Sequence, residues 1–486
     1  KEVFVCSLIV SLRCVFWVGL SIRGGGIDSP RPASQRAAAF ILTAAMLTTL
    51  TAPAFAKTWD IADGDITVKA GDTGNDVTQK GETTYGDTDT IITNQNKDIA
   101  SSNTVTIETN DKNDKVEVTL KDVNINVGSD SGSALTSNGD VTLTLKGDNS
   151  LTGGNGGSGI SSSGSLTITG GEKDSLTAQG GSGRSGIFSS GGVTISGGTV
   201  NATGGSSGSD SGDGIHSGSL TMKGGTVNAK GGSGADGGSG IRTFSSGGVT
   251  ISGGSTVNAT GGDASDKDAS AGGSGISGKG SLTVSGGTVT ANGGNGSKSE
   301  SSDRSNGGRG IDSGSLTVSG GTVTATGGDG CSGSYSDGGI GISSSSGGVT
   351  ISGGTVTATG GKSGSGDYSN GGNGISSSGS LSISGGTVTA TAGSSSGSGI
   401  HSRSDIDLSG SLELTAKAGS PNGKALSQNG IELDPNTFKE KLDPGANIIT
   451  KDADGKVIDQ VSIPRPVEPE GPVIPEESSS SSDGGS

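Results

Sequence analysis

A short unit that recurs through the middle of the chain constrains the fold more than any other feature. Each copy opens with Gly-Ile and closes with a Thr-rich segment, as in GISGKGSLTVSGGTVTANGG from residue 275 and GIDSGSLTVSGGTVTATGG from residue 310. The anchor isoleucines that open the copies are Ile160, Ile187, Ile215, Ile241, Ile276, Ile311, Ile342, Ile375 and Ile400. They recur at intervals of about 25 to 35 residues, which is the period of a solenoid.

Alternation inside each unit indicates β-strands rather than helices. In the copy from residue 275, Leu282, Val284, Val289 and Ala291 alternate with polar residues, so they are predicted to share one core face. The Gly-Gly pair between the two strands supplies a residue that accepts a positive φ at a tight corner. Each unit therefore predicts three short strands and three bends, one rung of a parallel β-helix. Stacked rungs place Ile on Ile and Val on Val.

Composition favours the same class of fold. The chain has 98 glycines in 486 residues, with 27% hydrophobic and 2% aromatic residues, which is too little apolar matter for an ordinary globular core. The glycines have no three-residue period, which excludes collagen. All prolines lie up to Pro53 or from Pro421 onward, so none interrupts the strands between. We predict an all-β, single-stranded parallel β-helix of about eleven rungs.

The N-terminal region predicts export. Residues 36–56, RAAAFILTAAMLTTLTAPAFA, have the basic start, apolar run and small-residue cleavage site of a secretory signal peptide, with cleavage after Ala56. The apolar stretch before residue 36 reads as a membrane segment or as upstream sequence wrongly taken as coding, and we favour the second interpretation. The formal net charge of −16 disfavours nucleic acid and tolerates cations. We expect a secreted or cell-surface monomer.

The rest of the chain divides into four parts. Residues 57–115 predict an N-terminal cap or irregular first rungs, and residues 116–433 predict the regular β-helix. Residues 434–463 predict a C-terminal cap that begins with a short helix. Residues 464–486 form a tail rich in proline and serine, typical of a linker towards a cell wall or a partner.

The segments DKVEVTLKDVNINV and GDVTLTLKGDNSLTG and the iterated SLTVSGGTVTATGG resemble the secreted bacterial carbohydrate-binding β-helix domains, over roughly residues 110 to 420. The resemblance implies a right-handed parallel β-helix that is related to polysaccharide lyases, binds polysaccharide with calcium and has no lyase activity. The family often carries Asp directly before Gly-Ile. In this chain Asp213 keeps that residue and is the implied calcium ligand, whereas Ser158, Arg309 and Asn373 replace it in other units.

The segments that join one unit to the next are longest on four consecutive units, at 263–274, 295–309, 329–340 and 362–373. Insertions at the same point of successive repeats lie on one face of a solenoid, often the binding face. Arg304, Tyr335 and Tyr368 each lie seven residues before an anchor isoleucine, which predicts one stacked column, flanked by Asp337 and Asp367. Aromatic and guanidinium planes stack on sugar rings or on one another. These residues are the predicted polysaccharide contact. The alternative is a set of tolerated surface insertions.

Spaced carboxylates in the first long segment, Asp263, Asp266 and Asp268, are candidate calcium ligands, although solvated charge is the alternative interpretation. Catalysis is not predicted. The two histidines, His216 and His401, lie on distant rungs and look like ordinary surface positions. A lyase of this fold needs a basic residue beside clustered carboxylates, and only Arg304 and Arg309 near Asp303 approach that arrangement.

Two other functions remain open at this point. The third strand of each unit points threonines outward, and stacked units would build a flat array of hydroxyl and methyl groups like that of ice-binding solenoids. The array consists of Thr322, Thr324, Thr326, Thr355, Thr357, Thr359, Thr387, Thr389 and Thr391. Threonine is also simply a good residue for an exposed strand. The repeat would serve equally well as a structural stalk or adhesin that holds another module away from the cell.

Overall fold

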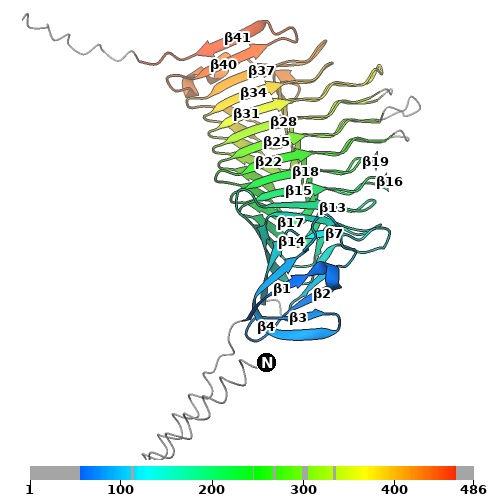
Figure 1. Cartoon of the computed structure of the whole chain (residues 1–486). Coiled ribbons are helices and arrows are strands. Elements are labelled where there is room, and N and C mark those ends of the chain that lie inside the picture. Colours follow the sequence, from blue (N-terminus) through cyan, green and yellow to red (C-terminus); the bar gives the residue numbers. More distant parts are fainter. Residues whose placement is uncertain are drawn as a thin grey trace, which may run out of the picture. The chain divides into compact units, whose positions relative to one another are not determined.

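The computed structural model describes residues 55–110, 114–244, 246–265, 270–297, 305–331 and 335–466. Within this part of the chain, strands wind into a coil whose successive turns pair side by side and parallel (Figure 1). Only two short 3-10 helices, Ile61–Asp63 and Pro435–Lys441, interrupt the described strands. No helix of the described residues has the length and apolar character to span a membrane. The predicted all-β class and parallel stacking are confirmed.

The first strand of each rung carries the anchor isoleucine. Successive strands pair in register, with Ile160 opposite Ile187, and Ile375 opposite Ile400, as predicted. In stacking order this first column consists of β5 (Val105–Glu108), β8 (Leu135–Ser137), β11 (Ile160–Ser162), the start of β14 (Ile187–Ile195), the start of β17 (Ile215–Met222), β20 (Ile241–Thr243), β23 (Ile276–Ser277), β26 (Ile311–Ser313), β29 (Ile342–Ser344), β32 (Ile375–Ser377), β35 (Ile400–Ser402) and β38 (Leu426–Gln428).

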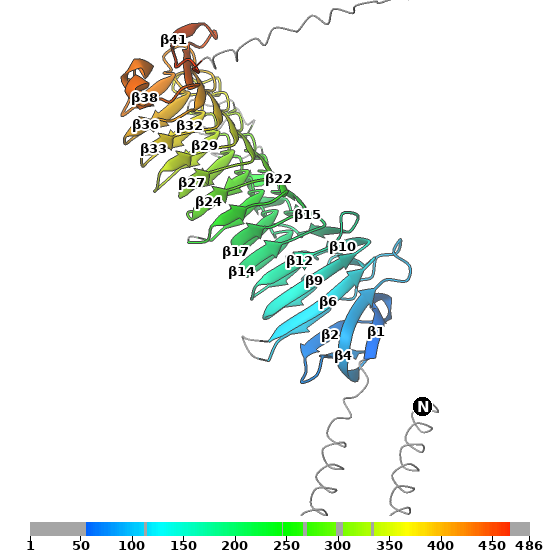
Figure 2. The same ribbon diagram turned by 90° about the vertical axis from the view of Figure 1, so that its left-hand side faces the viewer.

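The second strand of each rung forms a second parallel column, which Figure 2 shows from β6 to β36. It consists of β6 (Lys115–Lys121), β9 (Asp140–Lys146), β12 (Leu166–Thr169), the second parts of β14 and β17, β21 (Val249–Ile251), β24 (Ser281–Val284), β27 (Ser315–Val318), β30 (Val349–Ile351), β33 (Leu381–Ile383) and β36 (Ile406–Leu408). Its aliphatic residues also stack in register, for example Leu316 opposite Val349.

The third strand of each rung belongs to a separate 13-stranded sheet. It consists of β7 (Asn124–Asn126), β10 (Asp148–Thr152), β13 (Ser175–Gln179), β15 (Thr199–Thr203), β18 (Thr226–Lys230), β22 (Thr256–Thr260), β25 (Thr288–Asn292), β28 (Thr322–Thr326), β31 (Thr355–Thr359), β34 (Thr387–Thr391), β37 (Glu413–Lys417), β40 (Asn447–Lys451) and β41 (Val457–Ser462). The last pair, β40 with β41, is antiparallel and closes the sheet at its C-terminal end.

The core is narrow and continuous because each rung contributes a few inward side chains. In the rung that opens at Ile311, the buried hydrophobic residues are Ile311, Leu316, Val318, Val323 and Ala325, all with 0% exposure. Within the second and third strands the residues between them are half-buried or exposed, which is the predicted alternation.

The corner between the second and third strands uses glycine for its backbone conformation. In most rungs the second glycine of the pair has a positive φ, for example +79° at Gly287 and Gly321 and +77° at Gly386, whereas in the pair Gly253-Gly254 it is the first, with +62°. This conformation is strained for residues that carry a Cβ. The predicted role of these glycines is confirmed.

The coil begins earlier than residue 116. After β1 (Phe55–Asp60), β2 (Ile66–Ala70) pairs parallel with β5, and β4 (Glu82–Thr93) pairs parallel with β6, while β3 (Asn75–Gln79) joins β2 and β4 antiparallel. At the other end, the 3-10 helix Pro435–Lys441 lies where the short capping helix was predicted. The Asp434 carboxylate accepts from the Asn436 N–H at 2.8 Å at its start. Residues 1–54, with most of the predicted signal peptide, and most of the predicted tail lie outside the described residues.

Candidate functional site

Between the third strand of one rung and the first strand of the next, the chain leaves the coil and returns. We call these segments fingers; they project side by side from one corner of the coil (Figure 1). The described residues of the fingers lie within 204–214, 231–240, 261–275, 293–310, 327–341 and 360–374. In the two shorter ones, β16 (Ser207–Asp210) pairs parallel with β19 (Gly234–Asp236).

Glycines at the base of the fingers join them through backbone hydrogen bonds. The Gly328 N–H donates to the Gly308 carbonyl of the preceding finger at 2.8 Å, and the Gly339 N–H donates to the Gly328 carbonyl at 2.8 Å. The Gly361 N–H of the next finger then donates to the Gly339 carbonyl at 2.7 Å. The bonds therefore run in a zigzag between outgoing and returning legs, from finger to finger.

These glycines are needed for close approach and not for a special φ. A Cβ on Gly328 would lie 1.9 Å from the Gly294 carbonyl oxygen, and a Cβ on Gly339 would lie 1.9 Å from the Gly308 carbonyl oxygen. Neither Gly328 nor Gly339 belongs to the glycines with a positive φ. The backbone of neighbouring legs therefore occupies the space that any side chain would need.

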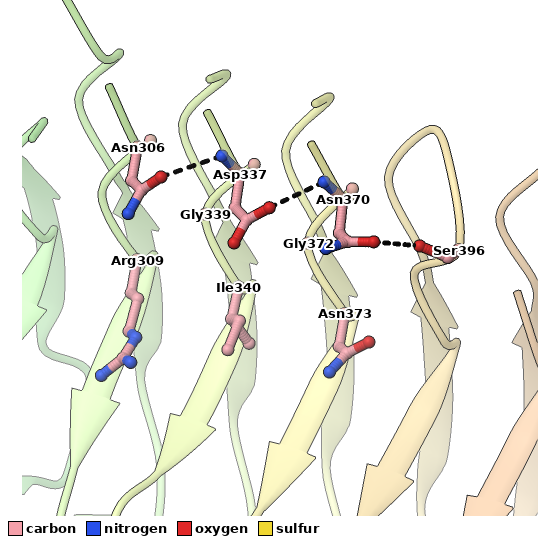
Figure 3. Close-up of a pocket in the computed structure, with 12 residues that line it drawn as sticks. Asn306, Arg309, Asp337, Gly339, Ile340, Asn370, Gly372, Asn373 and Ser396 are labelled. Carbon is pink, nitrogen blue, oxygen red and sulfur yellow. Dashed lines mark hydrogen bonds between the residues drawn. The ribbon is translucent and has the colours of Figure 1, made fainter. Parts of the chain in front are cut away.

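A row of polar side chains follows the returning legs of the last three of these fingers, as Figure 3 shows. The Asp337 N–H donates to Asn306 Oδ1 at 2.9 Å, and the Asn370 N–H donates to Asp337 Oδ1 at 2.7 Å. Ser396 belongs to the following rung, and its hydroxyl donates to Asn370 Oδ1. Each side chain thus satisfies a group of the next rung, and the row holds the fingers in register.

The outgoing legs carry a matching row. Asp263 Oδ1 accepts from the Asn295 N–H at 2.7 Å, Asn295 Oδ1 accepts from the Asp329 N–H at 3.0 Å, and Asp329 Oδ1 accepts from the Lys362 N–H at 2.8 Å. Asp263, a predicted calcium ligand, therefore uses one carboxylate oxygen to bind the next finger. The other two predicted ligands of that segment, Asp266 and Asp268, lie outside the described residues.

A hollow of about 390 Å³ lies over the returning legs. One side is the returning row that begins at Asn306. The other side is a second row, nearer to the first column, of Arg309, Ile340 and Asn373 (Figure 3). Arg309 Nη1 lies 2.8 Å from Asp312 Oδ1, which fixes the guanidinium on its own rung. Amide, carboxylate and guanidinium groups converge here on a volume within the usual range of small-ligand sites.

The structure brings the two predicted tyrosines together. The Tyr335 and Tyr368 rings are stacked, with centroids 5.2 Å apart and an interplanar angle of 13°, and they are 47% and 66% exposed. One face of each ring is therefore used by the other, so a sugar can stack only on the outer faces or contact the exposed edges. Asp367 is exposed beside Tyr368. Arg304, the predicted third member of the column, lies outside the described residues.

Asp213, the calcium ligand that the resemblance implies, lies on an earlier rung and is engaged by protein groups. Its Oδ1 accepts from the Ser239 N–H at 2.7 Å, and its Oδ2 lies 3.2 Å from His216 Nδ1 and 3.6 Å from Arg242 Nε. A guanidinium beside this oxygen opposes a metal cation there. In the described part of the chain, no three or more His, Cys, Asp or Glu side chains gather as a metal-binding group.

Several residues at this corner escaped the sequence interpretation. Asn306 and Asn370 build the returning row, and the signal that could have found them is the recurrence of Asn or Asp five residues before the anchor isoleucine, as at Asp337.

His216, on an earlier rung, was predicted to be an ordinary surface position. Its ring instead contacts Phe188 and Phe244, with centroid distances of 5.7 Å and 4.6 Å.

Comparison with protein families gives one match, to a family described as beta helix repeat, over residues 193–219, 282–297, 316–342 and 381–402. These four segments are similar to beta helix repeats. Each includes residues of a second strand and the third strand that follows it, so the match rests on the scaffold of the coil. Neither the curated proteins nor the solved structures give a match.

Proposed function

We propose that this chain is an exported, right-handed β-helix of about eleven rungs that binds polysaccharide without turning it over. The binding surface is the finger corner, with the hollow between Asn306 and Asn373 and the tyrosine pair beyond it. The observation that carries the proposal is the repetition of polar side chains at the same point of successive rungs. A periodic row suits a periodic ligand.

The chemistry of the row matches that of a polyhydroxylated chain. Asn370 and Asn373 offer amide donors and acceptors, Asp337 offers an acceptor, and Arg309 offers several donors. Rungs repeat at about 4.8 Å, so equivalent groups recur along the coil at a spacing comparable with the size of one sugar ring. Tyr368 adds an exposed aromatic surface beside this row.

Calcium would assist the binding of acidic polysaccharides, such as those of plant fibre. Asp263, Asp329 and Asp337 each use Oδ1 for the next finger. A ligand that carries carboxylates would be repelled by this acidic corner unless a cation lay between them, and carboxylate oxygens are the ligands that calcium prefers. Attachment to the bacterial surface or release from the cell would both present such a site to polysaccharide.

The test is retention of the chain on insoluble cellulose and on pectin, with calcium and with a chelator. The double variant Tyr335→Ala/Tyr368→Ala, and separately Asn373→Ala, should weaken retention at least about tenfold, since stacked aromatics and buried polar contacts dominate such sites. Tyr85→Ala is the matched control, because Tyr85 is 74% exposed on β4, in the N-terminal part of the coil. Equal retention of all three variants, or none by the parent chain, would leave a structural stalk or adhesin as the better function.

A second candidate function rests on the outer face of the third column. Thr322, Thr355 and Thr387 pair in register, and two further rows run beside them, at Thr324, Thr357 and Thr389 and at Thr326, Thr359 and Thr391. Such regular rows of hydroxyl and methyl groups are the surface that an ice-binding solenoid would need. A measurable gap between freezing and melting points in a solution of the chain would support this candidate, and coincidence of the two would exclude it.

A further inference from the structure

A second hollow, of about 420 Å³, lies on the N-terminal rungs, away from the fingers that carry the proposed polysaccharide site. It is lined by the rungs that open at Ile160, Ile187, Ile215 and Ile241. Its chemically distinctive lining residues are Arg184, Phe188, Ser211, Asp213, His216 and Arg242. None of these six residues belongs to the rows that build the finger corner.

Asp213 organises the floor of this hollow. The residue is 5% exposed, and its carboxylate binds the Ser239 N–H, the His216 ring and Arg242 Nε at the distances given above. His216 and Arg242 pair in register on adjacent strands of the first column, so one carboxylate fixes side chains from two rungs. The Arg242 guanidinium, whose side chain is 48% exposed, is therefore kept beside the carboxylate by charge attraction.

Aromatic rings support the same cluster. Phe188 meets His216 edge to face at 79°, and His216 lies tilted by 38° against Phe244. Phe, Trp and Tyr make up only 2% of the chain and it has two histidines, so two phenylalanine rings packed around a histidine ring are a concentration of scarce side chains. Phe188 also lines the hollow and gives it one apolar wall.

The charge of the hollow is opposite to that of the chain. The chain has a formal net charge of −16, yet the lining holds two arginines against one aspartate. Among the described residues, no hydrogen bond or ion pair engages the Arg184 guanidinium, whereas Asp213 is already paired with Arg242. The Ser211 hydroxyl oxygen is buried and has no hydrogen-bond partner in the described part of the chain. Donors and positive charge are therefore left over for a ligand.

We infer that this hollow binds a sugar that carries an oxyanion, either a carboxylate or a sulfate, directly through Arg184 and Arg242. The guanidinium planes offer paired N–H groups to two oxygens of the anion. Phe188 lies against the apolar face of the ring, and the serine hydroxyls of the wall accept and donate to sugar hydroxyls. No cation is needed, which separates this site from the calcium-aided binding proposed at the finger corner.

The test is calorimetric titration of the full chain with D-glucuronate, D-glucose 6-sulfate and, as the neutral match, D-glucose. At least one of the two anionic sugars should bind at least about tenfold more tightly than glucose, with an affinity that falls as sodium chloride is raised and stays unchanged with a chelator. A stronger response to the carboxylate or to the sulfate identifies which anion the hollow takes, and either result supports the site.

Variants locate the binding. Arg184→Gln and the double variant Arg184→Gln/Arg242→Gln should each lower the affinity for the anionic sugar, the double variant to the level of glucose. Arg403→Gln, which removes an exposed guanidinium that lines neither hollow, should leave it unchanged. Thermal melting of each variant checks that the coil is intact, and Arg184→Gln is the safer of the two because that side chain supports no described contact.

Equal affinity for anionic and neutral sugars, retention of binding in the double variant, or loss of binding with a chelator or in Arg403→Gln would overturn the inference. These outcomes are independent of the retention assay on cellulose and pectin. If the fingers do not bind polysaccharide, the proposal of an anionic-sugar site is unaffected. If the hollow does not bind anionic sugars, the proposal of polysaccharide binding at the fingers is unaffected.

Discussion

Successive rungs are held together by different interactions in the coil and in the fingers. In the coil, Ile311, Ile342 and Ile375 lie on one another at 0% exposure, and backbone bonds of parallel strands accompany them. At the base of the fingers no apolar side chain is involved, and glycine legs bond to glycine legs through the backbone. The hydrophobic effect stabilises the first arrangement, whereas the second depends on hydrogen bonds between closely approaching backbones.

This difference explains where chemistry can vary. A residue of the coil interior must be apolar and of the right volume, because the core is close-packed. A residue of a finger beyond its glycines lies outside this core, so its replacement leaves the packing of the coil interior unchanged, although side chains such as Asp337 also hold neighbouring fingers in register. The fingers are therefore the part of each rung that is free to acquire a binding surface.

The largest effect is expected from the coil interior. Ile342→Ala should lower the free energy of unfolding by about 3 kcal/mol, within the 2–5 kcal/mol typical of such truncations, because Ile311 and Ile375 would then face a cavity. Denaturant titration of the parent and variant chains measures the change. Ser376→Ala, which alters the half-exposed next position in the adjacent rung, is the control and should change little.

A glycine leg should behave differently. Gly339→Ala places a Cβ against the Gly308 carbonyl and should open the neighbouring fingers, so amide hydrogen exchange there should accelerate at least about tenfold. The free energy of global unfolding should change by less than about 1 kcal/mol, because the coil core is untouched.

The control for the glycine leg is Gly254→Ala, where a Cβ would meet nothing within 4 Å. Gly254→Ala should leave exchange in the fingers unchanged. If Gly339→Ala instead lowered the global stability as much as Ile342→Ala, the coil and the fingers would have to be one cooperative unit, and the distinction drawn between them would be wrong.

The smallest effect concerns the outer face of the coil. Burial first, and then the positive charges of Arg403 and Lys424, lower the pKa of His401 below the ordinary value of 6.5. The unfolded chain takes up this proton near pH 6.5 and the folded chain only at lower pH, so the free energy of unfolding falls as the pH drops through that interval.

His401→Ser should remove this part of the acid sensitivity, since Ser376 and Ser427 occupy the same position on the adjacent rungs. The difference between the melting temperatures of parent and variant, followed from pH 7.5 to pH 5, isolates the effect from other titrating groups. An identical pH dependence of the two chains would contradict it.

The repeat made most of the coil predictable. Leu282, Val284, Val289 and Ala291 were predicted to point inward from alternation alone, and all four are buried. The positive φ at Gly287 also followed from its place between two strands. These features depend on neighbours in sequence, which is why the sequence of this chain was enough to predict them.

The finger corner was predictable only in part. The seven-residue offset before the anchors placed Tyr335 on Tyr368, because rungs stack in register. The glycine zigzag was not foreseen, since glycine has no side chain whose pattern could reveal a partner on another rung. The cluster of Asp213, His216 and Arg242 was missed for a related reason: its members come from two rungs, and the residue types at these positions vary from one repeat to the next.

The register of the rungs has a consequence for how such a gene can change. Removal of residues 342–374 as a block would bring the rung of Ile311 directly onto that of Ile375, and every interior contact would be replaced by an equivalent one. Duplication of the same block would do the reverse. Because the repeated segments are nearly identical, unequal recombination can shorten or lengthen the protein by whole rungs, and each event alters the number of fingers while the closing strands at both ends stay in place.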